Sequence, residues 1–300
     1  MRPSDPKEIT VTTPTIDVHE TIPVGAPAPV LEARGLTKRY GDGDQQRAVL
    51  QGVNLSLAAN EFVCIVGHSG TGKTTLLRCL TGLLAPSEGT VSFKGEPVTG
   101  PPEGLAIVFQ DYSRSLLPWL SVERNIALPL EGKGHVREER ERRVAEAIDA
   151  VGLSAHAKKL PHELSGGMQQ RVAIARALAY QPTVLVMDEP FASVDAQTRS
   201  ELEDLTLRLK DQFHTSVLLV THDVDEAVYL ADRVIVLGGA PARVVRSEET
   251  GLGPDRDQIE TKATPRFAEV RAEILREIRA QSMGTSPTQL LQQIGMEVAP

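Results

Sequence analysis

The segment from residue 31 to residue 94 contains short apolar runs separated by residues that favour turns. The runs cover residues 31–36, 49–57, 62–66 and 91–94, and one of the turns is the Gly-Asp-Gly-Asp stretch at 41–44. Strands that lie close in sequence and are joined by turns usually pair antiparallel. We therefore expect these four segments to form an antiparallel layer.

Between residues 105 and 237 the pattern changes, and continuous apolar runs alternate with helical segments. These runs cover residues 105–109, 184–187, 217–220 and 234–237. A strand of a parallel sheet is buried on both faces, so it is apolar throughout, and helices connect it to its neighbours. The pattern therefore predicts an α/β fold with a parallel sheet at its centre.

The stretch between the first two of these later strands has no strong strand pattern. Residues 135–151 instead have the charges and alanines of a helix, and Gly152 is a suitable end for it. We therefore expect a helical subdomain, from about residue 111 to 165, within an α/β domain that spans residues 31–250.

The two ends of the chain differ from this central domain. Residues 1–30 carry repeated Pro and Thr with little apolar periodicity, which predicts a disordered leader. In the tail, residues 251–300, Thr264 and Pro265 form a good helix start. We expect this amphipathic helix to pack on the domain edge rather than to bind a partner, and the last 20 or so residues to be frayed. Its apolar stripe consists of Phe267, Val270, Ile274, Leu275 and Ile278.

Composition excludes several functions. The net charge of −8, without a block of Lys or Arg, weighs against nucleic acid as a partner and against direct binding to anionic lipid. Cys64 and Cys79 have no metal or disulfide spacing, so we interpret them as buried apolar residues in a reducing compartment. No apolar run approaches the roughly 18–20 residues that span a bilayer, and the N-terminus lacks a secretory signal. We expect a cytoplasmic chain that reaches a membrane only through a partner.

The strongest chemical motif is a glycine-rich loop between an apolar strand and a helix. It fits the pattern G-x-x-x-x-G-K-[ST], in which backbone N–H groups and a helix N-terminus surround phosphate oxygens. We expect Lys73 to neutralise the β- and γ-phosphates and Thr74 to bind Mg²⁺. His68 occupies a free position of the motif and receives no catalytic role. The loop residues expected at the nucleotide are Gly67, His68, Ser69, Gly70, Thr71, Gly72, Lys73, Thr74 and Thr75.

Two acids, Asp188 and Glu189, directly follow the apolar run 184–187. Acids that leave a buried strand are costly unless something uses them. We expect Asp188 to hold Mg²⁺ and Glu189 to polarise the attacking water. A salt-bridged strand end is the plainer alternative, and the phosphate loop upstream weighs against it.

With these motifs in place, the stretch Leu164-Ser165-Gly166-Gly167-Met168-Gln169-Gln170-Arg171 resembles the signature sequence of ATP-binding cassette (ABC) ATPases. Residues 31–245 or so are similar to an ABC transporter nucleotide-binding subunit, with all motifs in order. Met168, and the Ser-Val pair at 193–194, are mild departures. The resemblance implies a P-loop NTPase cassette with a RecA-like parallel-sheet core, an antiparallel β subdomain and a helical subdomain.

The resemblance also assigns roles to residues that carry little information alone. It implies that Tyr40 stacks on adenine, that Gln110 lies near Mg²⁺, and that His222 contacts the γ-phosphate. It makes Asp195 the acid of the D-loop. Ser165, Gly166 and Gly167 would face the ATP of a second ABC subunit, which we expect to be another copy of this chain, although a different cassette remains open. ATP and Mg²⁺ are the implied cofactors, and Gln110, Glu189 and His222 the implied catalytic residues.

A Leu-Leu-Pro-Trp-Leu segment at 116–120 resembles importer subunits for nitrate, sulfonates, taurine and related small solutes. The resemblance implies an integral membrane permease, an extracytoplasmic solute-binding protein, and a peripheral location at the cytoplasmic face of the inner membrane. Trp119 then lines a groove for the permease or, with equal weight, belongs to the core of the helical insert.

Two other functions are weighed against import. A soluble ABC ATPase of repair, translation or cluster assembly would need long insertions, zinc cysteines or a second phosphate loop, which the sequence does not contain. A regulator that binds ATP without hydrolysis is disfavoured by Glu189 and His222. The solute itself is not encoded, because such subunits do not touch it.

Overall fold

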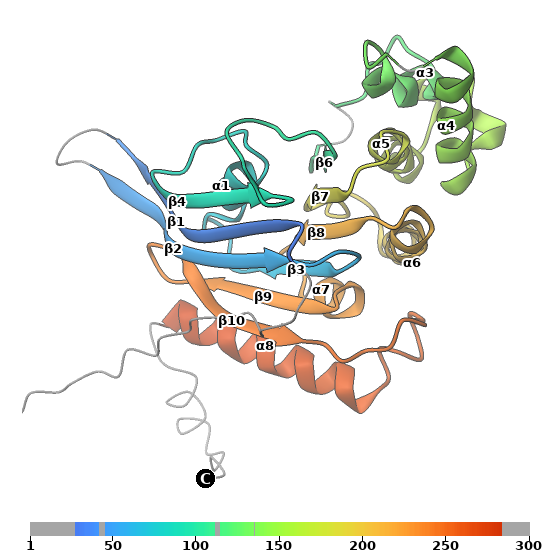
Figure 1. Ribbon diagram of the computed structural model, residues 1–300. Coiled ribbons are helices and arrows are strands. Elements are labelled where there is room, and N and C mark those ends of the chain that lie inside the picture. The colour runs from blue at the N-terminus through green and yellow to red at the C-terminus, as the bar shows by residue number, and fades with distance from the viewer. Residues whose placement is uncertain (1–27, 42–45, 112–114, 135, 284–300) are drawn as a thin grey trace, which may run out of the picture.

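The structure of the chain is a computed structural model that describes residues 28–41, 46–111, 115–134 and 136–283 (Figure 1). Most of the expected leader, the frayed tail from residue 284 and most of the turn at 41–44 lie outside these residues. Within them, two sheets and three groups of helices surround two apolar cores.

A six-stranded sheet forms the centre of the fold, in the order β10-β9-β3-β8-β7-β6 (Figure 1). Five of its strands are parallel, as the continuous apolar runs predicted, and β10 pairs antiparallel with β9 at the edge. The bounds are β3 Phe62–Val66, β6 Leu105–Val108, β7 Val184–Asp188, β8 Ser216–Val220, β9 Arg233–Gly238 and β10 Arg243–Glu249.

The second sheet is antiparallel, with the order β2-β1-β4-β5. Its strands are β1 Leu31–Tyr40, β2 Arg47–Leu57, β4 Glu88–Phe93 and β5 Glu96–Pro97. The expectation that residues 62–66 belong to this layer is wrong, because they form β3 between β8 and β9 of the parallel sheet. All five residues of β3 are buried, which a strand covered on both faces requires.

The two faces of the parallel sheet pack against different partners. One face meets the antiparallel sheet and helix α1 (Lys73–Leu80), and this core includes Cys79. The other face meets α5 (Gly166–Ala179), α6 (Ala196–Phe213) and α7 (Val224–Leu230), and this core includes Cys64. Both thiols are free and buried, which confirms their interpretation as small apolar residues.

The helical subdomain lies on the far side of the molecule from the antiparallel sheet (Figure 1). It contains α3 (Val122–Ala127), η2 (Leu128–Leu130), α4 (Arg137–Ala150), η3 (Ser154–His156) and η4 (Pro161–Glu163). The predicted charged helix is α4, and it ends before Gly152, whose φ of 71° suits glycine. Residue 135, where the helix was expected to begin, is outside the described residues.

Helix α8 (Pro265–Met283) packs along α7, β9 and β10 (Figure 1). Its first turn is capped as expected, since the Phe267 backbone N–H donates to the Thr264 hydroxyl at 3.2 Å. Phe267, Val270 and Ile274 are buried in the core, so the expected packing on the domain edge is confirmed. Across the described residues, no helix combines the length and apolar character that a membrane crossing requires.

This packing predicts a stability cost for truncating α8. Ile274→Ala removes a fully buried side chain, and we expect it to lower the free energy of unfolding by about 2–5 kcal/mol in urea denaturation. Arg279→Ala, on the exposed face of the same helix, should change it by less than about 0.5 kcal/mol. Equal effects of the two substitutions would show that α8 is not anchored by its apolar stripe.

Candidate functional site

The residues of the predicted site follow the carboxyl ends of neighbouring parallel strands. The glycine-rich loop follows β3, Gln110 follows β6, Glu189 follows β7 and His222 follows β8. In an open parallel sheet these ends meet along one edge, which is where such folds bind ligands. The sheet therefore brings together residues that are up to 155 positions apart (222 − 67) in the sequence.

Two glycines of the loop are required by close packing. A Cβ atom on Gly67 would lie 2.7 Å from the Leu237 carbonyl oxygen, and one on Gly72 would lie 2.9 Å from Cγ1 of Val49. Gly72 also has a φ of 95° and forms the N-cap of α1. The loop therefore ends directly at a helix N-terminus, where N–H groups without intrahelical partners attract anions.

Lys73 curls back over this loop. Its Nζ donates to the carbonyl oxygens of Gly67 at 2.8 Å and His68 at 3.1 Å, and the residue is only 6% exposed. Burial lowers the pKa of Lys73, and the carboxylates of Glu189 and Asp188 oppose this. The ammonium group is thus fixed at the centre of the loop, where phosphate oxygens can replace neutral carbonyls as acceptors.

Asp188 is the last residue of β7 and is 8% exposed. Burial raises the pKa of Asp188 and the neighbouring Glu189 adds to this, whereas a hydrogen bond with the Thr74 hydroxyl and the charge of Lys73 oppose it. Asp188 and Thr74 thus place two oxygen donors together, the ligand type that Mg²⁺ prefers.

The described residues contain no group of three or more His, Cys, Asp or Glu side chains that could hold a metal ion by themselves.

Two of the three predicted catalytic residues, His222 and Gln110, contact the same carboxylate oxygen of the third, Glu189. Oε2 of Glu189 lies 3.2 Å from Nδ1 of His222 and 3.4 Å from Nε2 of Gln110. Glu189 also has a φ of 44°, a conformation that is unfavourable for a side-chain-bearing residue, and its N–H donates to the Val220 carbonyl at 2.8 Å. Backbone strain of this kind, held by the surrounding structure, is typical of functional sites.

The expected signature and D-loop residues form a second cluster. Ser165 caps α5 by accepting a hydrogen bond from the Met168 N–H at 3.3 Å. Asp195 caps α6, accepting from the N–H and hydroxyl of Thr198 at 3.0 and 2.7 Å, and these bonds hold the pKa of Asp195 below its ordinary value. A Cβ atom on Gly167 would lie 2.4 Å from Cγ2 of the same Thr198. Thr198 therefore joins the two motifs.

Within the described part of the chain, no hydrogen bond links Ser165, Gly166 or Gly167 to the glycine-rich loop.

Five further predicted residues belong to the end of β1 or to the glycine-rich loop. Tyr40, 43% exposed, ends β1 with the Lys38 ammonium 5.5 Å from its ring centroid. Nε2 of His68 lies 2.9 Å from the Ile278 carbonyl oxygen of α8, so its side chain faces the tail helix. The hydroxyl of Thr71 donates to the His68 carbonyl, while Ser69 is exposed and Thr75 is half-buried.

Trp119 is 71% exposed, so the interpretation that places it in the core of the helical insert is wrong. Its neighbour Leu116 fills that core instead. The other interpretation, in which Trp119 lines a groove for the permease, requires an exposed side chain of this kind.

The structure also places two residues next to the site that the sequence analysis missed. Arg199 on α6 and Glu226 on α7 line the same small cavity as Glu189 and His222. The available signal was the spacing of Glu226, which lies one helical turn beyond the helix-capping Asp223 and next to apolar residues.

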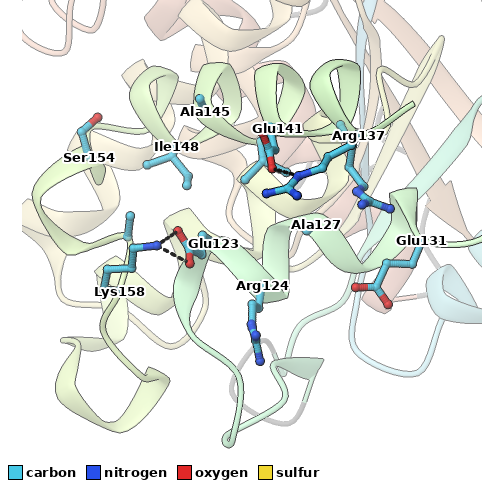
Figure 2. Close-up of a pocket in the computed structure, with 13 residues that line it drawn as sticks. Glu123, Arg124, Ala127, Glu131, Arg137, Glu141, Ala145, Ile148, Ser154 and Lys158 are labelled. Atoms are coloured by element: carbon cyan, nitrogen blue, oxygen red, sulfur yellow. Dashed lines mark hydrogen bonds and ion pairs between the residues drawn. The ribbon is translucent and has the colours of Figure 1, made fainter. Parts of the chain in front are cut away.

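A larger groove lies elsewhere, between α3 and α4 of the helical subdomain (Figure 2). Its volume is about 1000 Å³, but none of the residues that line it belongs to the site. Figure 2 shows that charged residues of its walls pair with each other, Lys158 with Glu123 and Arg137 with Glu141.

Comparison with known proteins gives consistent results. A family model described as ABC transporter matches residues 50–192. The chain is 43% identical over 242 residues to the nitrate import ATP-binding protein NrtC of Synechococcus elongatus, covering 80% of this chain and 36% of that protein. It is 44% identical over 237 residues to the bicarbonate transport ATP-binding protein CmpC of Synechocystis sp., covering 78% and 35%. The chain thus spans about a third of the length of these two relatives.

Other relatives are covered almost completely. An uncharacterised ABC transporter ATP-binding protein of Methanocaldococcus jannaschii is 43% identical over 245 residues, which cover 82% of this chain and 90% of that one. A dimeric ATP-binding cassette in a post-hydrolysis state with ADP and Pi has a similar structure, with a TM-score of 0.63 and 33% identity over 73% of this chain and 98% of that chain.

The contact between Gly167 and Thr198 predicts a specific coupling between the two motifs. We expect Gly167→Ala to lower the free energy of unfolding by about 1–3 kcal/mol, because its new methyl group meets Cγ2 of Thr198. Thr198→Ser removes Cγ2 and keeps the hydroxyl that binds Asp195, so the double variant should regain most of the loss. Additive effects in urea denaturation would contradict the contact.

Proposed function

The chain belongs to the ABC transporter family of ATP-binding proteins, and on this premise we propose that it binds and hydrolyses ATP to power an importer. The observation that carries the proposal is the convergence of Gln110 and His222 on Glu189 beside the phosphate-binding loop. A protein that only binds nucleotide needs the loop but has no need for a strained carboxylate oriented by two further side chains.

In the proposed reaction, the loop N–H groups and Lys73 hold the phosphates. Thr74, Asp188 and the Oε1 atom of Gln110, whose Nε2 is directed to Glu189, would hold Mg²⁺. When bound, Mg²⁺ supplies Lewis-acid stabilisation of charge on the phosphate oxygens.

Glu189 accepts a proton from the attacking water, because the other carboxylate at this strand end, Asp188, is bonded to Thr74 and assigned to Mg²⁺. Nδ1 of His222 lies against Glu189, which leaves Nε2 as the ring atom available to the γ-phosphate. Tyr40 offers an exposed ring on which adenine can stack.

A second copy of the chain would complete each site. Ser165 caps α5, Gly166 and Gly167 begin it, and a helix N-terminus attracts phosphate. A dimeric cassette among the similar structures supports a head-to-tail arrangement in which each signature closes the site of the partner copy. Closure of this kind orients the reactants before hydrolysis.

The proposed partner, whose transport ATP hydrolysis would drive, is a membrane permease. Trp119 and Phe109 expose large apolar surface close to Gln110 in the sequence, at 71% and 45%. An apolar helix end of a permease would bury this surface, which would hold the chain peripherally at the cytoplasmic face of the membrane. An extracytoplasmic solute-binding protein belongs to the proposed complex.

The solute that we propose is a small anion. Similarity to nitrate and bicarbonate transport proteins supports this class. The sulfonates implied by the resemblance are also anions, and taurine, a zwitterion, carries the same anionic sulfonate group. The same similarity favours import over the alternative of a soluble ABC ATPase without a membrane partner.

The role of Glu189 can be tested with the purified full chain. We expect Glu189→Gln to retain ATP binding and to lose hydrolysis by about 10²–10⁴-fold, because the amide cannot accept the proton of the water. Phosphate release and nucleotide affinity are measured in parallel. Glu260→Gln, an exposed acid outside the site, serves as the control and should hydrolyse ATP normally. Near-normal turnover of Glu189→Gln would remove Glu189 from the role of base.

The membrane partner can be tested by affinity purification from detergent-solubilised membranes. We expect a multi-span permease to copurify with the wild-type chain and to be lost with Trp119→Ala, while ATP hydrolysis persists. Ile259→Ala replaces an apolar side chain that is equally exposed, at 76%, and should keep the permease. Recovery of the wild-type chain without any membrane protein would support the soluble class instead.

A further inference from the structure

A small cavity lies beside Glu189 and His222. Its volume is about 10 Å³, which is about the space that one water molecule requires. Besides the proposed base and the histidine, it is lined by Arg199 of α6, by Glu226 of α7, and by Ala192, Thr221 and Asp223.

Two polar atoms of the residues that line this cavity lack a hydrogen-bond partner. Oε1 of Glu226 and Nε of Arg199 are buried, and neither makes a hydrogen bond to any described residue. Glu226 is only 4% exposed. Other atoms of the two side chains are engaged: Nη1 of Arg199 donates to Asp223 at 3.2 Å, and the Thr221 hydroxyl bonds to the Glu226 carboxyl. Buried polar groups normally have partners, so these two atoms point to a bound water.

The surroundings of Glu226 decide its charge. Burial raises the pKa of Glu226 to about 8, the nearby carboxylates of Glu203 and Asp223 add to this, and Thr221 and Arg199 only partly oppose it. The Cys64 thiol, on the β3 side, is neutral because burial raises its pKa well above the usual range. Glu226 is therefore protonated near pH 7, and its carboxyl can donate one hydrogen bond.

We propose that protonated Glu226 is a positioning residue for ATP hydrolysis, and that it acts on Glu189 through one water bound in this cavity. The inference rests on the proposed function for its catalytic meaning. The water accepts hydrogen bonds from Nε–H of Arg199 and from the carboxyl of Glu226. Both protons of the water then remain for donation, and the carboxylate of Glu189 accepts one of them.

This third hydrogen bond would hold Glu189 in place together with Gln110 and His222. Ionised Glu226 no longer donates and instead accepts one of the two protons of the water, and its negative charge repels the carboxylate of Glu189, so the water holds Glu189 less firmly. Glu226 itself touches neither nucleotide nor attacking water. The arrangement predicts that hydrolysis declines as the pH rises past about 8.

The main test compares pH profiles of ATP hydrolysis for the full chain and its variants. Glu226→Gln is a neutral isostere, so we expect activity within a few-fold of wild type at pH 7 and no decline from this group at high pH. Glu226→Leu cannot bind the water, and we expect a loss of about tenfold or more at every pH with unchanged ATP affinity.

Glu203→Gln is the matched control. Glu203, on α6, is buried like Glu226, but it accepts a hydrogen bond from Gln258 and does not line the cavity. This variant should keep the high-pH decline, moved to lower pH because a charge that raises the pKa of Glu226 is gone. The role of Glu226 is overturned if its Gln variant keeps the wild-type decline or is as inactive as its Leu variant.

Thermal unfolding tests the charge state without hydrolysis. The folded chain keeps the Glu226 proton up to about pH 8, whereas the unfolded carboxyl loses it near the ordinary value of 4.5. Between these pH values the folded state binds one proton more, so the stability from this group falls as the pH rises. The Tm of Glu226→Gln minus that of wild type should therefore increase across this window and level off above it. A constant difference would overturn the charge state.

A crystal structure that resolves ordered waters separates this inference from the proposed function. We expect one water within hydrogen-bond distance of Oε1 of Glu226 and Nε of Arg199. A wild-type chain that never hydrolyses ATP would overturn the proposed function, even with the water present. A dry cavity in an active chain would overturn the inference alone.

Discussion

The position of β3 in the parallel sheet is the constraint on which the site depends. Hydrogen-bonded pairing to β8 on one side and β9 on the other fixes where the glycine-rich loop emerges. The sheet order then places His222, Glu189 and Gln110 at successive strand ends beyond the loop. The carboxylate of Asp188 lies close enough to affect the pKa of Lys73 only because these strands run in the same direction and end at the same edge.

Around this edge the chain builds two kinds of functional surface. The first is the glycine-rich loop with its acids, whose residues all belong to one chain and which the signature of a partner copy is proposed to close. The second is the start of α5, where Gly167 packs closely on Thr198, which in turn bonds to Asp195. A rigid signature is useful when it must close a site on another copy, because little order has to be gained at closure.

Sequence reasoning predicted the motifs well and their surroundings less well. Spacing and strand–loop–helix context were enough to place Lys73 at the start of a helix, Asp188 and Glu189 at a strand end, and Gly166 at the start of α5, because these features are local. The assignment of β3 failed because closeness in sequence does not determine which strands pair. The spacing of Glu226 from Asp223 did not reveal that its carboxyl is buried, since this burial depends on how α6 and α7 pack against each other. These features depend on tertiary contacts that have no local pattern.

The contact between His68 and Ile278 has a consequence for how the protein is made. It joins residues 210 positions apart, and β3 likewise needs partners that are translated more than 150 residues after it. The glycine-rich loop therefore cannot make all of the contacts described here until residue 278 has emerged from the ribosome. Such long-range pairing is slow, because the entropy of closing large loops is lost before the contacts form. During that interval the nascent chain carries its phosphate motif without a working nucleotide site.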